Sequence, residues 1–176
     1  MKLNTKNGFD FGTNILDVKV PEALRTKVKT GIDYIDGSYG GQGLTPSSVT
    51  LFTGTPGAGK TTMMLKLVDS LVGNGSVGVF NTGEESLYQV KLTAERLKLK
   101  NGFAVGEETH VPTLLKKCDE IRAAHPKKQF VLVIDSLQTM DDGKYKDGST
   151  NSRTPERALA LITDWCKENN TCAIVI

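Results

Sequence analysis

The chain has 176 residues, a mixed composition in which 38% of residues are hydrophobic, and a formal net charge of only +2. This length fits one globular domain with a single core, and no apolar run is long enough to span a bilayer. The small net charge excludes a strong polyanion-binding surface over the whole molecule, so any nucleic-acid binding must come from a local patch.

The two ends of the chain differ in character. Residues from Met1 to about Pro21 are polar and aperiodic and lack the apolar core of a secretory signal, which predicts an N-terminal arm over 1–20. The chain stops inside the apolar run Cys172–Ile176, which is typical of a buried strand. We therefore expect residues 21–176 to form the N-terminal portion of a longer domain, truncated at its C-terminus.

The cysteines bear on the cellular compartment. Cys118, Cys166 and Cys172 show no CxxC spacing and leave an odd thiol. This pattern predicts reduced, buried cysteines in a cytoplasmic protein and argues against a structural zinc site.

The first half of the chain alternates between strand and helix patterns. Thr30–Asp36 predicts a short helical turn that leads into a glycine-rich loop, Gly37–Gly43. Ser48–Thr53 is rich in residues that favour strands and is bounded by proline and glycine, which predicts a buried strand. Apolar residues then recur at helical spacing from Met63 to Val72, and Gly73–Gly75 ends that helix.

The middle of the chain continues the alternation. Val77–Thr82 predicts the next strand, and a helix is expected from about Ser86 to Lys100, with Asn101 and Gly102 as its stop. Phe103–Val105 is short and apolar enough for a strand. Apolar residues at helical spacing between Leu114 and Ala124 then predict a helix closed by a proline.

The last third contains the clearest strand pattern, the continuous apolar run Phe130–Asp135. A polar loop from Asp141 to about Arg153 follows, and then a helix with Thr154 as N-cap and Pro155 in its first turn. Strands that alternate with helices, and that are apolar throughout, indicate an α/β fold whose mostly parallel sheet is covered by helices on both faces.

One motif carries the strongest chemical signal, a run that matches the P-loop pattern G-x-x-x-x-G-K-[ST]: Gly54, Thr55, Pro56, Gly57, Ala58, Gly59, Lys60 and Thr61, followed by Thr62. Its glycines let backbone N–H groups converge on a phosphate, and the following helix adds the positive end of its dipole. Lys60 can bridge the β- and γ-phosphates and the Thr61 hydroxyl can ligate Mg²⁺. A predicted strand before the motif and a long helix after it support a nucleoside triphosphate site, with ATP and Mg²⁺ as ligands.

Three carboxylates are expected near this loop. Asp135 ends the strong strand and is followed by Ser136, as in a Walker B element, so it can hold the Mg²⁺ shell; the alternative is a turn or N-cap aspartate. Glu84 and Glu85 follow the strand Val77–Thr82, at the carboxyl edge of the predicted sheet. One of them, Glu84 by preference, can act as general base toward an attacking water; the alternative is a pair of solvated helix-start acids.

The loop after the Asp135 strand contains basic residues next to an aromatic one. Lys144, Lys146, Arg153 and also Arg157, close to Tyr145, are typical of a surface that follows a single nucleic-acid strand. Nearby acidic residues dilute the charge, so a solvated loop is an equal alternative. His110 and His125 have no partners at metal-ligand spacing, and we interpret both as surface residues.

Together these residues resemble the RecA-like ATPase core of the bacterial RadA (Sms) family of DNA repair and recombination proteins. The resemblance covers residues from about 30 to 176 and rests on four runs: Thr30–Asp36, the P-loop, Thr82–Leu92 together with Ala94–Leu97, and Val133–Met140. The Gly-Glu-Glu-Ser and Ile-Asp-Ser-x-Gln-Thr-Met segments within these runs are unusual among P-loop proteins.

The resemblance implies a RecA-like fold, ATP hydrolysis, assembly into a homo-oligomeric ring or filament, and single-stranded DNA binding, with no role at a membrane. It assigns the water-activating glutamate to Glu84 and the first central DNA loop to about Asp141–Arg153. The family's N-terminal zinc finger has no counterpart here. Its Lys-Asn-Arg-Phe-Gly motif and its Lon-protease-like domain would fall after Ile176. A stand-alone or viral version of the family fits equally well.

Other functions remain open at this point. A signalling ATPase or autokinase resembling KaiC also carries paired glutamates after this strand, and a replicative helicase motor resembling DnaB has the same core. A nucleotide-binding scaffold that hardly turns over is disfavoured by the complete set of Lys60, Asp135 and Glu84.

Overall fold

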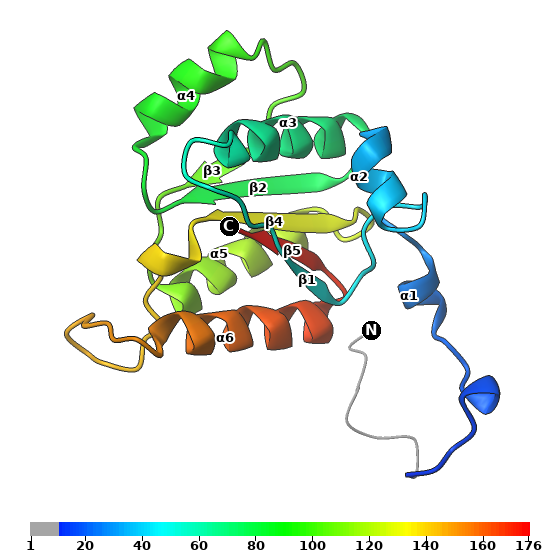
Figure 1. Cartoon of the computed structure of the whole chain (residues 1–176). Helices are drawn as coiled ribbons and strands as arrows, with labels where there is room; N and C mark the ends of the chain where they lie inside the picture. Colours follow the sequence, from blue (N-terminus) through cyan, green and yellow to red (C-terminus); the bar gives the residue numbers. More distant parts are fainter. Residues whose placement is uncertain (1–10) are drawn as a thin grey trace.

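The computed structural model describes residues 11–176 and contains one parallel sheet between two layers of helices (Figure 1). The first ten residues of the predicted arm lie outside the described part. Along the chain the elements are η1 Ile15–Asp17, α1 Glu22–Arg25, α2 Asp33–Ser38, β1 Ser48–Leu51, α3 Lys60–Gly73, β2 Val77–Thr82, α4 Leu87–Arg96, β3 Ala104–Gly106, α5 Val111–Ala124, β4 Phe130–Asp135, η2 Leu137–Thr139, α6 Thr154–Asn169 and β5 Cys172–Val175.

The sheet has the strand order β1-β5-β4-β2-β3, and neighbouring strands in the described part of the chain all pair in parallel. Helix α3 lies on one face, with α2 and α4 beside it, and α5 and α6 cover the other (Figure 1). The predicted fold class, a mostly parallel sheet covered by helices on both faces, is therefore confirmed. None of the helices in the described part combines the length and apolarity needed to cross a bilayer.

Strand β4 lies at the centre of this sheet and is buried along its whole length. Its side chains alternate between two cores, because successive residues of a strand point to opposite faces. Val131 and Val133 pack in the core under α3, whereas Leu132 and Ile134 pack in the core that α5 and α6 cover. This double burial explains why the run is apolar at every position.

Strand β1 differs from its prediction as a buried strand over Ser48–Thr53. It forms only Ser48–Leu51 and lies at the edge of the sheet, where β5 is its single partner in the described structure. Leu51 is 54% exposed as a result. The residues after it leave the strand to form the P-loop, which is why the strand is shorter than the apolar run.

Helix α4 also ends earlier than expected, at Arg96 instead of Lys100. The cause is a contact that is distant in sequence. The buried carboxylate of Asp69, on α3, accepts hydrogen bonds from the backbone N–H groups of Lys100, Asn101 and Gly102 at 2.8–3.3 Å. The Asn101 side-chain amide donates to the same carboxylate at 3.1 Å. These bonds hold the segment after α4 against α3, so that the segment does not continue the helix.

Two residues at the starts of helices differ from their predictions. Thr154 is the first helical residue of α6 and not its N-cap, and its hydroxyl accepts a 2.9 Å hydrogen bond from the Asn151 backbone N–H. His110 was predicted to be a surface residue, but it is half-buried and caps α5 through its ring Nδ1, which lies 2.7 Å from the Thr113 hydroxyl oxygen. His125 is exposed, as expected. The three cysteines are buried and free, and burial raises the pKa of Cys118 and Cys172 to about 12.

Replacing Asp69 with alanine tests this account of the segment after α4. Loss of several charge-assisted hydrogen bonds should lower the free energy of unfolding by about 2–3 kcal/mol, measured by urea denaturation. Glu95→Ala is the control, because Glu95 pairs only with exposed Lys91 at 3.2 Å, and its loss should cost less than about 1 kcal/mol. Equal effects of the two substitutions would contradict the assignment.

Candidate functional site

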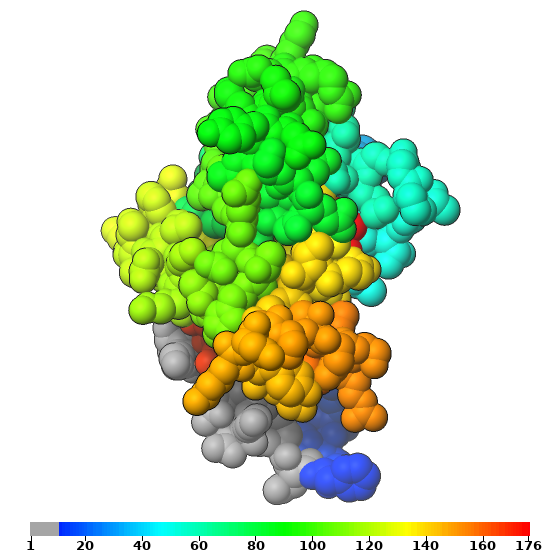
Figure 2. All heavy atoms as spheres, turned by 90° about the vertical axis from the view of Figure 1, so that its left-hand side faces the viewer, coloured from blue at the N-terminus to red at the C-terminus, as the bar shows by residue number. Residues whose placement is uncertain are grey.

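A cleft of about 740 Å³ lies where the P-loop meets the carboxyl ends of the strands. Figure 2 views the molecule from this side. Residues at or just after the ends of β1, β2, β4 and β5, together with the first turn of α3, line the cleft: Leu51, Phe52, Thr53, Gly54, Pro56, Gly57, Gly59, Lys60, Thr61, Thr62, Glu84, Glu85, Asp135, Ser136, Leu137, Gln138 and Ile176. Of the predicted nucleotide-binding run, all residues except Thr55 and Ala58 line it. The structure thus brings the P-loop together with all three predicted carboxylates.

The P-loop backbone has the curvature that a phosphate cradle requires. Gly57 and Gly59 have φ angles of 75° and 85°, in the left-handed region where a side chain would be strained. Gly59 directly precedes Lys60, the first residue of α3, so the first N–H groups of this 14-residue helix open toward the loop. The Lys60 ammonium donates to the backbone oxygens of Gly54 at 3.0 Å and Thr55 at 3.2 Å. Its positive charge therefore lies within the cradle.

Thr61 and Asp135 meet across the cleft. The Thr61 hydroxyl donates to Asp135 Oδ2 at 2.5 Å, which joins the first turn of α3 to the end of β4. Asp135 is buried, and this burial raises its pKa, with a smaller contribution from the negative charge of Glu84; the bond from Thr61 and the charge of Lys60 act in the opposite direction. Two hard oxygen donors at the base of a phosphate cradle suit a small divalent cation.

The paired glutamates lie on a turn that a threonine holds. The Thr82 hydroxyl oxygen accepts from the backbone N–H groups of Glu84 at 3.3 Å and Glu85 at 3.0 Å, so the chain turns directly after β2. The Glu84 carboxylate accepts a hydrogen bond from the Ser136 hydroxyl, and the Glu85 side chain lines the same cleft. Ser136 follows Asp135 directly, so its place after the strand was the only sequence signal for this contact.

The two unusual sequence runs touch each other. The Gly83 backbone N–H donates to the Asp135 backbone oxygen at 2.8 Å and extends the pairing of β2 with β4. A Cβ atom on Gly83 would lie 2.0 Å from the Thr139 hydroxyl oxygen, so only glycine fits here. That hydroxyl donates back to the Ser136 backbone oxygen at 2.8 Å. Thr139 therefore supports the turn that presents Ser136 to Glu84, a role that sequence reasoning had not assigned.

The predicted DNA-binding residues lie outside the cleft. Lys144, Lys146 and Arg153 are all exposed on the loop between η2 and α6, which projects to the left of the sheet in Figure 1 and faces the viewer in Figure 2. The Lys144 ammonium lies 5.5 Å from the centroid of the Tyr145 ring. The short turn η2, which follows Ser136, connects this loop to the cleft.

Arg157 has a structural role at the base of this loop. Its guanidinium donates to the carboxylate of Asp142, whose side chain is only 2% exposed. This hydrogen bond holds the pKa of Asp142 below its usual range, with a further lowering from the Lys144 backbone N–H. The positive charge of Arg157 is therefore paired with Asp142 inside the protein.

Comparison with known proteins shows which families this chain is similar to. The model of a family described as ATPase, KaiC, matches residues 28–176. The DNA repair protein RadA of Mycobacterium tuberculosis (strain H37Rv) is 34% identical over 90% of this chain and 32% of its own length, and RadA of Aquifex aeolicus is 32% identical over 84% and 32%. The chain spans about a third of the length of these curated relatives.

Solved structures show the same fold at low identity. A DnaB-like replicative helicase has a TM-score of 0.69 at 15% identity, with 85% of this chain and 44% of that one covered. The ATPase domain of G40P has a TM-score of 0.63 at 15% identity, with 88% and 65% covered. Together with the family match, these structures confirm the expected RecA-like ATPase fold.

Disrupting the ion pair between Asp142 and Arg157 should loosen the candidate DNA-binding loop. In Arg157→Gln, amide hydrogen exchange over residues 143–153 should accelerate on the order of tenfold, because the loop loses its buried anchor. Arg153→Gln, which alters an exposed cation nearby, should leave the exchange rate unchanged.

The same pair predicts a pH dependence. The pKa of Asp142 is lowered in the folded state, so the protection should be complete above the usual aspartate value of about 3.9 and be lost as the pH falls through the lower folded value. Protection factors, in which the exchange rate is corrected for its intrinsic pH dependence, would contradict this role if neither the substitution nor acid changed them.

Proposed function

Because this chain belongs to the KaiC family of ATPases and is similar to bacterial RadA proteins, we propose that it binds ATP with Mg²⁺ and hydrolyses it while acting on DNA in repair or recombination. The observation that carries this proposal is the convergence of Lys60, Thr61, Asp135 and Glu84 in one cleft. We place this activity in a cytoplasmic homo-oligomer, as the relationship to RadA suggests.

The binding step follows from the P-loop. Backbone N–H groups at the start of α3 and the Lys60 ammonium would hold the β- and γ-phosphates. Thr61 and Asp135 are the residues that would hold Mg²⁺, and their two oxygens already lie within 2.5 Å of each other. When bound, Mg²⁺ would neutralise charge on the phosphates and so favour transfer of the terminal phosphoryl group. Mg²⁺ usually keeps several water ligands, so two protein ligands are sufficient.

The chemical step is assigned to Glu84. Its carboxylate accepts the proton of a water molecule whose oxygen attacks the γ-phosphorus, and the bond from that phosphorus to the bridging oxygen breaks to give ADP and inorganic phosphate. The Ser136 hydroxyl holds the Glu84 carboxylate by a hydrogen bond, so Ser136 acts as a positioning residue. Glu85 lines the cleft and is the alternative base.

The proposed DNA contact uses Lys144, Lys146 and Arg153. These cations are exposed, and the neighbouring Tyr145 offers a ring on which a base can stack. In a ring or filament every protomer would present the same loop, so a modest patch becomes a repeated basic surface.

A signalling ATPase or autokinase is the second candidate, because the matching family is described by the name KaiC. The similarity to proteins named as DNA repair RadA favours the first candidate. Stimulation of ATP turnover by single-stranded DNA separates the two, since only the first candidate requires it.

The Lys60→Ala substitution tests the nucleotide site. It should weaken ATP binding by roughly tenfold to a hundredfold, and ADP binding less, because the γ-phosphate loses its cation. Calorimetry with Mg²⁺ measures both affinities. Lys66→Ala, which removes an exposed lysine from the same helix, is the control. Unchanged ATP affinity in Lys60→Ala would contradict the proposed site.

Comparing Glu84→Gln with Glu85→Gln tests the assignment of the base. Loss of a general base lowers the rate by about 10²–10⁴-fold, so Glu84→Gln should bind ATP normally but hydrolyse it slowly. Glu85→Gln should be milder. Phosphate release in the steady state provides the rates, and the opposite ranking of the two variants would transfer the role to Glu85.

The triple substitution Lys144→Ala/Lys146→Ala/Arg153→Ala tests DNA binding in the assembled protein with ATP. Each lost phosphate contact should reduce the slope of log affinity against log salt for single-stranded DNA by about 0.7. The control Lys116→Ala/Lys127→Ala/Lys128→Ala removes three exposed cations elsewhere. If affinity and slope stay unchanged in the loop variant, the loop is only solvated and the signalling candidate becomes the stronger one.

A further inference from the structure

The turn η2 carries a side chain in the nucleotide cleft to which the proposed function assigns no role, that of Gln138. Two hydrogen bonds already pair four of the cleft's polar side chains, Thr61 with Asp135 and Ser136 with Glu84. Gln138 lines the same cleft and is exposed. In the part of the chain that the structure describes, neither its amide oxygen nor its amide nitrogen has a hydrogen-bond partner. The amide can therefore contact a ligand in the cleft.

The turn η2 is anchored on both sides of Gln138. Leu137 donates its backbone N–H to the Ile176 backbone oxygen at 2.8 Å, and its side chain is buried in the core that α5 and α6 cover. The Thr139 hydroxyl donates to the Ser136 backbone oxygen at 2.8 Å. Because the residues before and after it are held, Gln138 extends into the cleft from a fixed position.

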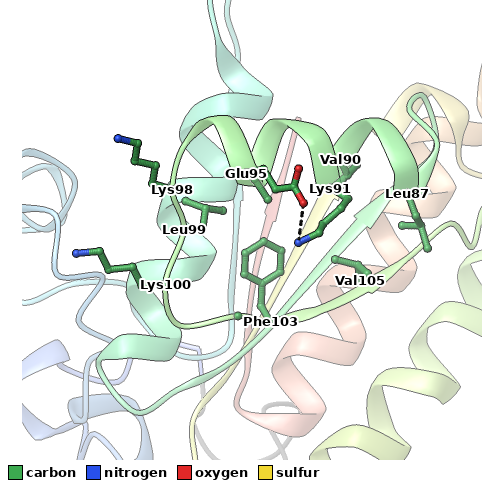
Figure 3. A pocket seen from close by; sticks show the side chains of 11 residues that line it. Leu87, Val90, Lys91, Glu95, Lys98, Leu99, Lys100, Phe103 and Val105 are labelled. Atoms are coloured by element: carbon green, nitrogen blue, oxygen red, sulfur yellow. Dashed lines mark ion pairs between the residues drawn. The ribbon is translucent and has the colours of Figure 1, made fainter.

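Helix α4, which follows the paired glutamates, offers no such group. It lies above the Phe103 ring and Val105, with an apolar groove of about 560 Å³ between them (Figure 3). Residues of α4 line this groove, and none of them lines the nucleotide cleft. Among the cleft residues of the described chain, Gln138 carries the only side-chain amide.

Hydrolysis places two demands on the groups around the γ-phosphate. The attacking water needs an acceptor that fixes its orientation, and the phosphoryl oxygens, which carry negative charge in the transition state, need donors. A glutamine amide supplies one acceptor oxygen and two N–H donors, and it does not titrate. It can therefore bind both partners without taking the proton that Glu84 is to accept.

We propose that Gln138 is a catalytic residue that orients the attacking water. Its amide oxygen accepts one hydrogen of the water, and its amide N–H donates to a γ-phosphate oxygen. Glu84 accepts the other proton as the water oxygen bonds to the γ-phosphorus and the bond to the bridging oxygen breaks. Gln138 itself neither gains nor loses a proton. This inference rests on the proposed ATP hydrolysis and adds a second residue to its chemical step.

The substitution Gln138→Met in the full chain tests this role, because it keeps the length of the side chain and removes its hydrogen-bonding groups. Single-turnover hydrolysis should slow by roughly tenfold to a hundredfold, the loss expected for a hydrogen bond to a charged group. Affinities for ATP and ADP, measured by calorimetry with Mg²⁺, should stay within about twofold of the parent, because the contact matters in the transition state. Affinity for ADP with aluminium fluoride, which mimics the transferring phosphoryl group, should fall with the rate.

Two controls separate a role in chemistry from a structural one. Urea denaturation of Gln138→Met should match the parent, since the side chain has no partner to lose in the described structure. Gln42→Met should match the parent in rate and affinities, because Gln42 is exposed and does not line the cleft. A slower rate in Gln138→Met that came with a lower free energy of unfolding, or with an equal loss of ATP affinity, would overturn the inference.

The remaining outcomes distinguish this role from the proposed function on which it rests. If the parent hydrolyses ATP and Gln138→Met has the same rate and the same affinity for ADP with aluminium fluoride, the role of Gln138 is refuted and the proposed ATPase stands. A parent that neither binds nor hydrolyses ATP would refute both. Slow hydrolysis with normal ATP binding and weakened binding of the mimic would support the assignment of Gln138.

Discussion

The parallel pairing of β2 with β4 fixes the position of the candidate catalytic groups. In this register Thr82 lies beside Asp135, the last residue of each strand, so the segments that follow emerge next to each other. Glu84 and Ser136 meet only because of this alignment. A shift by one residue would reverse the faces of the side chains on β4, so that Leu132 and Ile134 would have to fit the core that now holds Val131 and Val133. The demands of the core therefore hold the site in register.

Sequence patterns predicted those features that depend on neighbouring residues. The P-loop, the start of α3 and the strand β4 follow from local glycine placement and apolar runs, and the structure has them where expected. The end of α4 could not be predicted, because it depends on Asp69, which is 31–33 residues earlier than the N–H groups it accepts from. The pairing of Arg157 with Asp142 also depends on the tertiary fold. It could not be predicted, because the sequence of this loop contains several other charged residues that could have paired instead.

The connection between the cleft and the loop is short and anchored at both ends. Ser136 contacts Glu84, and five residues later the backbone of Asp141 pairs with Thr109 and Val111 at the start of α5. Only η2 lies between these anchors. A displacement of the basic loop can therefore be absorbed by its exposed tip or be passed on to η2. A shift of η2 would move the Ser136 hydroxyl, which positions Glu84. In the proposed function, this connection is the route by which a strand bound at the loop would alter ATP turnover.

The charge on a single protomer sets a limit on DNA binding. Three loop cations correspond to a salt slope of only about 2, and the whole chain, with these cations included, has a net charge of only +2, so the other residues add no net attraction. One protomer is thus a weak ligand for a nucleic-acid strand at physiological salt. Repetition of the loop along a strand raises the affinity without any new contact, since each further loop binds within the same complex. Assembly is therefore the step on which the proposed DNA function depends.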